Sequence, residues 1–131
     1  SALPGKILID VTVPLVPPKV ARVQLPKEGS AGEIAQTILG DEIMVVSAFQ
    51  NVAAHHLKEG EGIQCDVLVS GNEKNAREQV IQLVEAAGMK GYHAGLISNA
   101  AAAEAMTSVL INLNRQFKGH TGIKITGTDN D

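Results

Sequence analysis

The sequence predicts an α/β fold with a mainly parallel sheet. Short apolar runs rich in β-branched residues alternate along the chain with segments whose apolar residues recur at helical spacing. Internal repeats and low-complexity linkers are absent from the sequence. With 131 residues and 44% hydrophobic content, the chain is long enough for one domain with a core and too short for two. We therefore expect a single domain over residues 1–131.

The first half of the chain predicts a strand, a helix and a second strand. Lys6–Thr12 is almost continuously apolar, which is typical of a strand buried on both faces. Ser30 precedes Glu33 by three residues, the spacing of a capping box, and Gly40 provides a stop signal. A helix over residues 31–39 follows from these signals. Met44–Ala48 is apolar and short, as expected of a buried strand.

The second half predicts two helices and further short strands. The expected elements are a strand over residues 65–71, a helix over 73–87, a short strand or extended turn over 91–95, a long helix from 98 or 99 to 117, and a final short strand over 123–126. The long helix is rich in alanine, and its small residues allow close packing, either within the chain or at a dimer seam. Gly119 is its expected C-cap.

The end of the second strand is the strongest candidate for a ligand site. In open α/β sheets, ligands bind just beyond the carboxyl ends of the strands. Phe49, Gln50 and Asn51 lie at this position. Amide side chains beside small residues suit a flat ring with polar edges. An ordinary surface turn between a strand and a helix explains the same residues equally well, so both interpretations stay open.

Composition excludes several classes of protein. A net charge of -3 and an aromatic content of 2% argue against nucleic acid as the main partner. The longest mainly apolar stretch, Ala100–Leu113, contains Glu104 and Asn112 and is too short to cross a membrane. Cys65 is the single cysteine, which excludes an internal disulfide and favours a reducing, cytoplasmic setting. We expect Cys65 to be a small core residue.

The histidines do not predict a metal site. His55 and His56 are adjacent, and neighbouring residues on a helix point about 100° apart, so they cannot easily share one ion. His93 and His120 lie near glycines, where roles in turns are expected, although His120 could also contact a ligand.

Two acidic residues stand in otherwise apolar segments. Asp10 lies late in the first strand, where capping the following turn is its default role. Glu104 lies within the alanine-rich helix and is either a polar residue of helix packing or a contact to a partner helix. Glu104 has no histidine or second carboxylate in helical register, which general acid–base catalysis would need, and no catalytic side chain is predicted.

Five blocks of sequence carry a family resemblance. They are Asp10–Leu15, Ser47–Ala54, Cys65–Gly71, Ala103–Leu110 and Gly122–Gly127. In this order they resemble the C-terminal portion of NADPH-dependent coenzyme F420 reductases (F420H2:NADP oxidoreductases). The resemblance covers Lys6 to Gly127 and implies a partial doubly wound, Rossmann-like sheet. It also implies hydride transfer between NADP and the deazaflavin ring of F420, with the protein positioning the two rings.

The resemblance also implies a set of cofactor-binding residues. Thr12 and Pro14 would lie near the nicotinamide ribose, and Thr121 and Gly122 would meet the polar edge of the deazaflavin with their main chain. The residues between them would form the wall of the ring site. Together with the strand-end residue Phe49, the full set is Thr12, Pro14, Phe49, Gln50, Asn51, Val52, Ala54, Thr121 and Gly122.

The N-terminal half of that family has no counterpart in this sequence. This half carries the glycine-rich turn that binds pyrophosphate, and the basic residues that read the 2′-phosphate of NADP. We therefore expect weak NADP binding and little or no reductase activity from this chain alone. The alternative is a non-catalytic module that binds a small ligand or assembles with itself. The bare edge of Lys6–Thr12 would be covered by self-association into a homo-oligomer, by a rearranged segment of the chain, or by a separately encoded partner.

Overall fold

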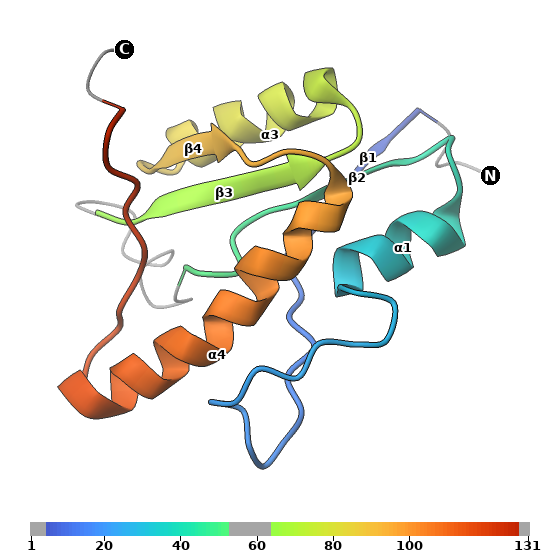
Figure 1. Cartoon of the computed structure of the whole chain (residues 1–131). Helices are drawn as coiled ribbons and strands as arrows, with labels where there is room; N and C mark the ends of the chain where they lie inside the picture. Colours follow the sequence, from blue (N-terminus) through green and yellow to red (C-terminus); the bar gives the residue numbers. More distant parts are fainter. Residues whose placement is uncertain (1–4, 53–63, 129–131) are drawn as a thin grey trace.

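The computed structural model describes residues 5–52 and 64–128 (Figure 1). The elements are β1 (Ile7–Asp10), α1 (Ala31–Leu39), β2 (Met44–Ser47), β3 (Asp66–Gly71), α3 (Lys74–Ala86), β4 (Lys90–His93), a 3-10 turn η1 (Ile97–Asn99) and α4 (Ala100–Phe117). The order of these strands and helices is the predicted one up to the end of the long helix.

The four strands form one mixed sheet in the order β1-β2-β3-β4. The pairs β1–β2 and β3–β4 are parallel, whereas β2 and β3 run antiparallel. Each parallel pair is joined by a helix, α1 in the first and α3 in the second. The predicted α/β class with a mainly parallel sheet is confirmed, and the antiparallel pair at its centre was not predicted.

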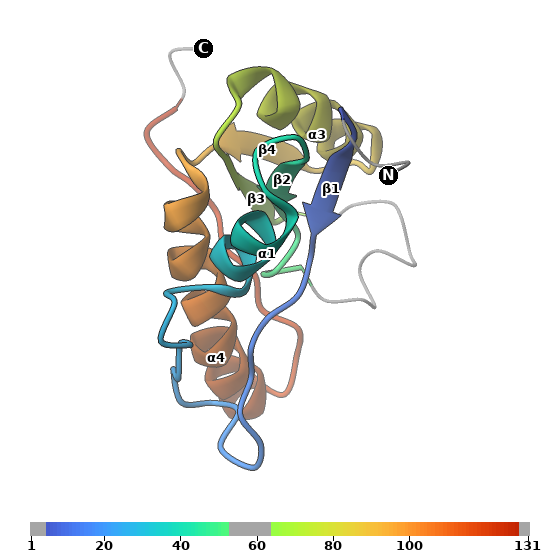
Figure 2. The same ribbon diagram turned by 90° about the vertical axis from the view of Figure 1, so that its right-hand side faces the viewer.

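Helices cover both faces of the sheet (Figure 2). On one face, α3 packs on the larger core through Ala76, Val80 and Val84. On the other face, Val45 of β2 packs against Ile97 and Ala100 at the start of α4, with α1 beside them. Val45 and its neighbour Val46 therefore belong to opposite cores, as alternation along a strand requires. No helix in the described parts of the chain is long and apolar enough to cross a membrane.

The start and end of α1 are encoded locally. The Ser30 hydroxyl oxygen accepts a hydrogen bond from the backbone N–H of Glu33 at 3.0 Å, so the predicted N-cap is confirmed. Gly40 follows the helix with a φ of 76°, a conformation in which glycine carries no side-chain penalty. At the end of α4 the left-handed residue is Lys118, one position before the predicted Gly119.

The first strand is exposed more than its sequence predicts. β1 forms an edge of the sheet, and Leu8 is 43% exposed. The expected burial on both faces is therefore wrong, because α1 leaves an open groove over Leu8 instead of covering it. The expectation of a bare edge at this strand agrees with the observed strand order.

The final short strand predicted over residues 123–126 does not form. These residues run extended beside the start of β3 and are held there through Asp66. The Asp66 backbone N–H donates to the Ile123 carbonyl oxygen at 2.8 Å, and the Ile125 N–H donates to Asp66 Oδ2 at 2.6 Å. A side-chain carboxylate therefore accepts the bond that a strand carbonyl would accept in a ladder.

Candidate functional site

The candidate residues at the end of β2 form a tight turn that folds into the protein. Phe49 has a φ of 70°, which is uncommon for a residue other than glycine. Its ring packs against the larger core. The next two residues, Gln50 and Asn51, are both buried. We call residues 49–52 the β2 turn.

Gln50 joins the β2 turn to β1. Its side-chain Nε2 donates to the Asp10 backbone carbonyl at 2.8 Å. The side chain is 6% exposed, and its Oε1 atom has no hydrogen-bond partner among the described residues. A buried acceptor without a donor is unfavourable unless another molecule supplies one. Gln50 therefore combines a structural bond with an unused polar atom.

Asn51 joins the same turn to α4. Its side-chain Nδ2 donates to the Ala103 carbonyl at 2.8 Å and to Thr107 Oγ1 at 3.1 Å. The Thr107 hydroxyl in turn donates to the Gln50 backbone carbonyl at 3.0 Å. The Asn51 amide nitrogen thus already has two protein acceptors. A direct ligand role for Asn51 stays a prediction.

Asp10 caps the turn after β1, as predicted. Its Oδ1 accepts from the Thr12 backbone N–H at 2.9 Å and from the Thr12 hydroxyl at 2.6 Å. This bonding is an Asx-type turn, which fixes where the chain leaves the sheet. Thr12 is exposed beyond β1, and Pro14 is half-buried two residues later.

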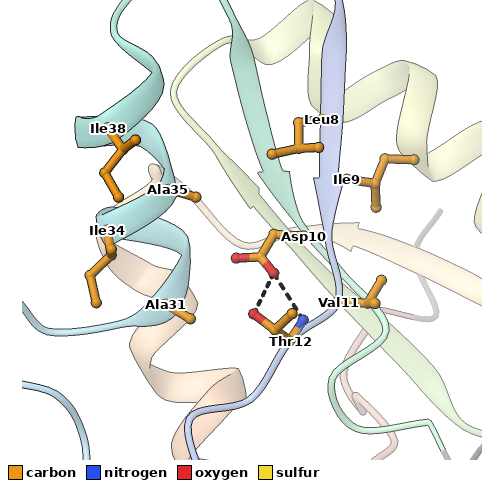
Figure 3. A pocket seen from close by; sticks show the side chains of 9 residues that line it. All are labelled: Leu8, Ile9, Asp10, Val11, Thr12, Ala31, Ile34, Ala35 and Ile38. Carbon is orange, nitrogen blue, oxygen red and sulfur yellow. Dashed lines mark hydrogen bonds between the residues drawn. The ribbon is translucent and has the colours of Figure 1, made fainter.

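A groove of about 450 Å³ lies between β1 and α1 (Figure 3). Its walls are mostly apolar, and the Asp10 carboxylate and Thr12 lie at one end. The lining residues are Leu8, Ile9, Asp10, Val11, Thr12, Ala31, Ile34, Ala35 and Ile38. Ile38 and Leu8 are exposed on this side, at 76% and 43%. The groove therefore continues the open edge of β1 as an apolar surface.

A smaller pocket of about 180 Å³ brings four of the predicted residues together. They are Gln50, Asn51 and Val52 of the β2 turn, with Thr121 from the segment after α4. Thr121 is held there by Asn114, whose Oδ1 accepts from both the N–H and the hydroxyl of Thr121 at 2.6 Å. Leu110 and Ile111 of α4 add an apolar wall. We call this space the turn pocket.

The other predicted residues lie outside the turn pocket. Thr12 lines the groove instead, and Gly122 lines a separate space of about 190 Å³ beside Cys65 and His120. Ala54, His55 and His56 fall outside the described residues. Within the described ranges, no group of three or more histidine, cysteine or acidic side chains could hold a metal ion.

Gly122 packs directly on Cys65. A Cβ atom at residue 122 would lie 2.7 Å from the Cys65 Cβ. Cys65 itself is 8% exposed, and its sulfur lies 3.9 Å from the Met89 sulfur. Burial raises the pKa of the Cys65 thiol, which keeps it protonated and unreactive. These contacts fit the predicted core role of Cys65.

Glu104 is an important residue whose contacts the sequence did not reveal. It is 1% exposed, and its carboxylate accepts from the backbone N–H groups of Ala31 at 2.7 Å and Gly32 at 3.1 Å. Burial raises the pKa of Glu104, the two backbone hydrogen bonds oppose this, and the charges of Asp10 and Glu33 add to the rise. The sequence marked Glu104 as unusual because it is an acid within an alanine-rich helix, but it did not indicate which groups the carboxylate would bind.

We expect Asn51→Ala to destabilise the protein even without ligand. The substitution removes the Asn51 hydrogen bonds to the Ala103 carbonyl and the Thr107 hydroxyl, at a cost of about 1 kcal/mol each. Urea unfolding followed by circular dichroism measures this change. Asn112→Ala, at an exposed position of the same helix that holds Asn51, is the control and should change stability little. Equal stability of Asn51→Ala and wild type would contradict the structural role.

We expect Gly122→Ala to detach or shift the segment after α4. The added methyl would meet the Cys65 side chain at a separation that real Cβ atoms do not adopt, with a cost of about 1–3 kcal/mol. Thermal unfolding should show a lower midpoint for this variant. Gly119→Ala is the control, because a Cβ there would meet its nearest neighbour at 3.9 Å. An unchanged midpoint for Gly122→Ala would show that the segment is not packed on Cys65.

Comparison with known proteins identifies relatives of nearly the whole chain. No protein family profile matches it. The F420-dependent NADP reductase of Methanocaldococcus jannaschii is 38% identical over 133 residues, covering 97% of this chain and 59% of the relative. The reductase of the same name from Methanothermobacter thermautotrophicus is 37% identical over 128 residues, covering 92% of this chain and 55% of the relative.

Comparison with solved structures identifies the same kind of reductase as the sequence comparison. A protein from Arthrobacter sp. FB24, assigned as an F420-dependent NADP reductase, superposes with a TM-score of 0.80 at 30% identity, over 95% of this chain and 59% of that one. Protein SMa0349 of Sinorhizobium meliloti shares the fold, with a TM-score of 0.58 at 21% identity. The chain spans somewhat more than half the length of the reductases that it matches. It is therefore similar to F420-dependent NADP reductases over 55–59% of their length, which is consistent with a C-terminal portion of that family.

Proposed function

We propose that this chain provides the F420 side of an F420:NADP oxidoreductase site. Two of the relatives above are named for F420 and NADP, so both molecules are expected as ligands of the complete reductase. The observation that supports a ring site in this chain is the Gln50 Oε1 atom at the β2 turn, which has no hydrogen-bond partner among residues 5–52 and 64–128. A ring N–H of the ligand would supply the missing donor.

The turn pocket fits one edge of a ring system. Its volume of about 180 Å³ is below the range of about 300–1,000 Å³ typical of a complete ligand site. Leu110 and Ile111 can contact a ring face, while Gln50 and Thr121 can meet its polar edge. We therefore assign the pyrimidine-like edge of the deazaflavin to the turn pocket, with the rest of the ring outside it.

The chemistry in this proposal belongs to the two ligands. F420 and NADP, when bound, supply the donor and the acceptor of the hydride. The protein contributes position: the bonds of Gln50 to β1 and of Asn51 to α4 fix the β2 turn before a ligand arrives. A fixed wall reduces the entropy lost when two rings are brought into contact. No side chain is assigned a proton transfer.

NADP binding requires an anchor for the pyrophosphate, and this sequence lacks the usual one. The sequence has no glycine-rich turn between a strand and a helix, the usual anchor for the pyrophosphate. We propose that the chain alone binds F420 and has little or no NADPH:F420 activity. We place it in the cytoplasm, since its single cysteine fits a reducing compartment.

The second candidate function is assembly through the β1 edge. Among the described residues, no strand pairs with the outer edge of β1, and the groove beside it is lined mostly by apolar side chains. An edge of this kind is a template for pairing with another strand. We propose that a second polypeptide covers it, either another copy of this chain or a separately encoded partner. The first of these makes the chain a homo-oligomer.

We expect F420 to bind the purified chain with micromolar affinity. Isothermal titration measures the binding, with NADP titrated separately and expected to give little heat. Ile111→Trp should abolish F420 binding by filling the turn pocket, because Ile111 lines it. Val109→Trp, at an exposed position of the same helix, is the matched control and should bind normally. Absence of heat from the folded wild type would contradict the F420 site and favour an assembly module.

We expect the chain to self-associate at micromolar concentration through β1. Leu8→Lys should shift sedimentation toward the monomer, because a charge at this edge opposes strand pairing. Leu83→Lys is the control: Leu83 is 55% exposed but lies on α3, which covers the opposite face of the sheet. A monomeric wild type in analytical ultracentrifugation would count against the homo-oligomer. Equal effects of both variants would show that the contact is elsewhere.

A further inference from the structure

Glu104 connects two helices that lie beside the candidate site. It projects from α4, and its two carboxylate oxygens accept the backbone N–H groups of Ala31 and Gly32, which are 73 and 72 residues away in the sequence. The first N–H groups of a helix have no partner within that helix, and its N-terminus favours negative charge. Glu104 therefore caps α1 from outside, beside the local cap by Ser30.

The turn of α4 that carries Glu104 also holds the β2 turn. The Ala103 carbonyl accepts from Asn51 Nδ2, and the Thr107 hydroxyl donates to the Gln50 carbonyl. One turn of α4 is thus bonded to α1 through Glu104 and to the candidate ligand residues through its neighbours. A change in the bonds between Glu104 and α1 would therefore reach Gln50 and Asn51 through a short series of hydrogen bonds.

The surroundings of Glu104 make its charge sensitive to pH. The ionisable groups that act on it from the packed elements are Asp10 of β1 and Glu33 of α1, and both are acidic. Burial, followed by these two charges, raises the pKa of Glu104. An acid whose pKa is higher in the folded state stabilises the fold below its unfolded pKa. That contribution is lost as the pH rises through the folded value.

We propose that Glu104 is a positioning residue whose protonation state controls how α1 and the β2 turn are held on α4. The ionised carboxylate accepts both α1 N–H groups. The neutral acid keeps one good acceptor, since its hydroxyl oxygen accepts poorly, so the bond to one of the two N–H groups weakens. The part of this inference that concerns F420 rests on the function proposed above, whereas the part that concerns α1 does not.

An NMR pH titration of the ligand-free chain tests the inference. The amide resonances of Ala31 and Gly32 should shift together at a pH above the ordinary pKa of a glutamate. Signals of Gln50 and Asn51 should follow the same titration. In Glu104→Gln, whose side chain does not ionise, this shared titration should disappear. Ser30→Ala is the matched control: it removes the bond to the Glu33 N–H and should leave the shared titration in place.

Two outcomes would overturn the inference. In the first, Ala31 and Gly32 show no titration that depends on Glu104. In the second, they titrate while Gln50 and Asn51 do not, which would confine the effect to α1. If Glu104→Gln fails to fold by circular dichroism, the wild-type titration decides the matter, because the inference requires all four residues to report the same pKa.

Binding of F420 across the same pH range provides the second readout. The dissociation constant of the wild type should change by about threefold or more through the Glu104 titration, and that of Glu104→Gln should stay constant. A pH-independent affinity in the wild type would overturn the link to the ligand site. If the wild type binds no F420 at any pH, the proposed function fails, and the NMR titration still decides the role of Glu104.

Discussion

The amide side chains of Gln50 and Asn51 impose the constraint on which the rest of this structure depends. Gln50 bonds to the backbone of β1, and Asn51 bonds to the backbone and a hydroxyl of α4. The residue before them, Phe49, adopts a positive φ and leaves its ring in the core. One short turn therefore sets the positions of the edge strand β1, its neighbour β2 and helix α4 relative to each other. Any ligand that meets this turn meets a surface fixed by buried hydrogen bonds.

The parts of the fold that the sequence predicted are those set by short-range signals, such as helix caps and turns. The N-cap at Ser30, the stop at Gly40 and the turn made by Asp10 each act within four residues along the chain, so their spacing in the sequence is sufficient. The long-range roles were not predictable in this way. The partners of Glu104 lie 72 and 73 residues away, and no pattern in the alanine-rich helix names them. The segment after α4 has the alternating pattern of a strand, and the sequence therefore predicted one. Periodicity could not show that the Asp66 side chain would accept the Ile125 N–H in place of a strand carbonyl.

The candidate site was predictable in place but not in detail. The rule that ligands bind beyond the carboxyl ends of strands located the β2 turn, and the turn pocket indeed collects Gln50, Asn51, Val52 and Thr121. The sequence could not show that the side-chain amide nitrogens of Gln50 and Asn51 already donate hydrogen bonds inside the protein. It also gave no sign that Gly122 would pack on Cys65 and so line a different space from Thr121.

The two edges of the sheet differ in a way that limits how copies of this chain could stack. On β4, the ammonium of Lys90 lies 5.2 Å from the centroid of the Tyr92 ring, and the Tyr92 hydroxyl lies 3.1 Å from the hydroxyl of Thr128 in the C-terminal segment. A charged residue and a neighbouring segment therefore occupy the surroundings of that edge, whereas β1 exposes Leu8. A fibril needs two open edges on every subunit, one to receive a strand and one to offer it. If copies of this chain pair through β1 as proposed, the charged side chain on β4 would oppose a second pairing there, and assembly would end at a closed pair.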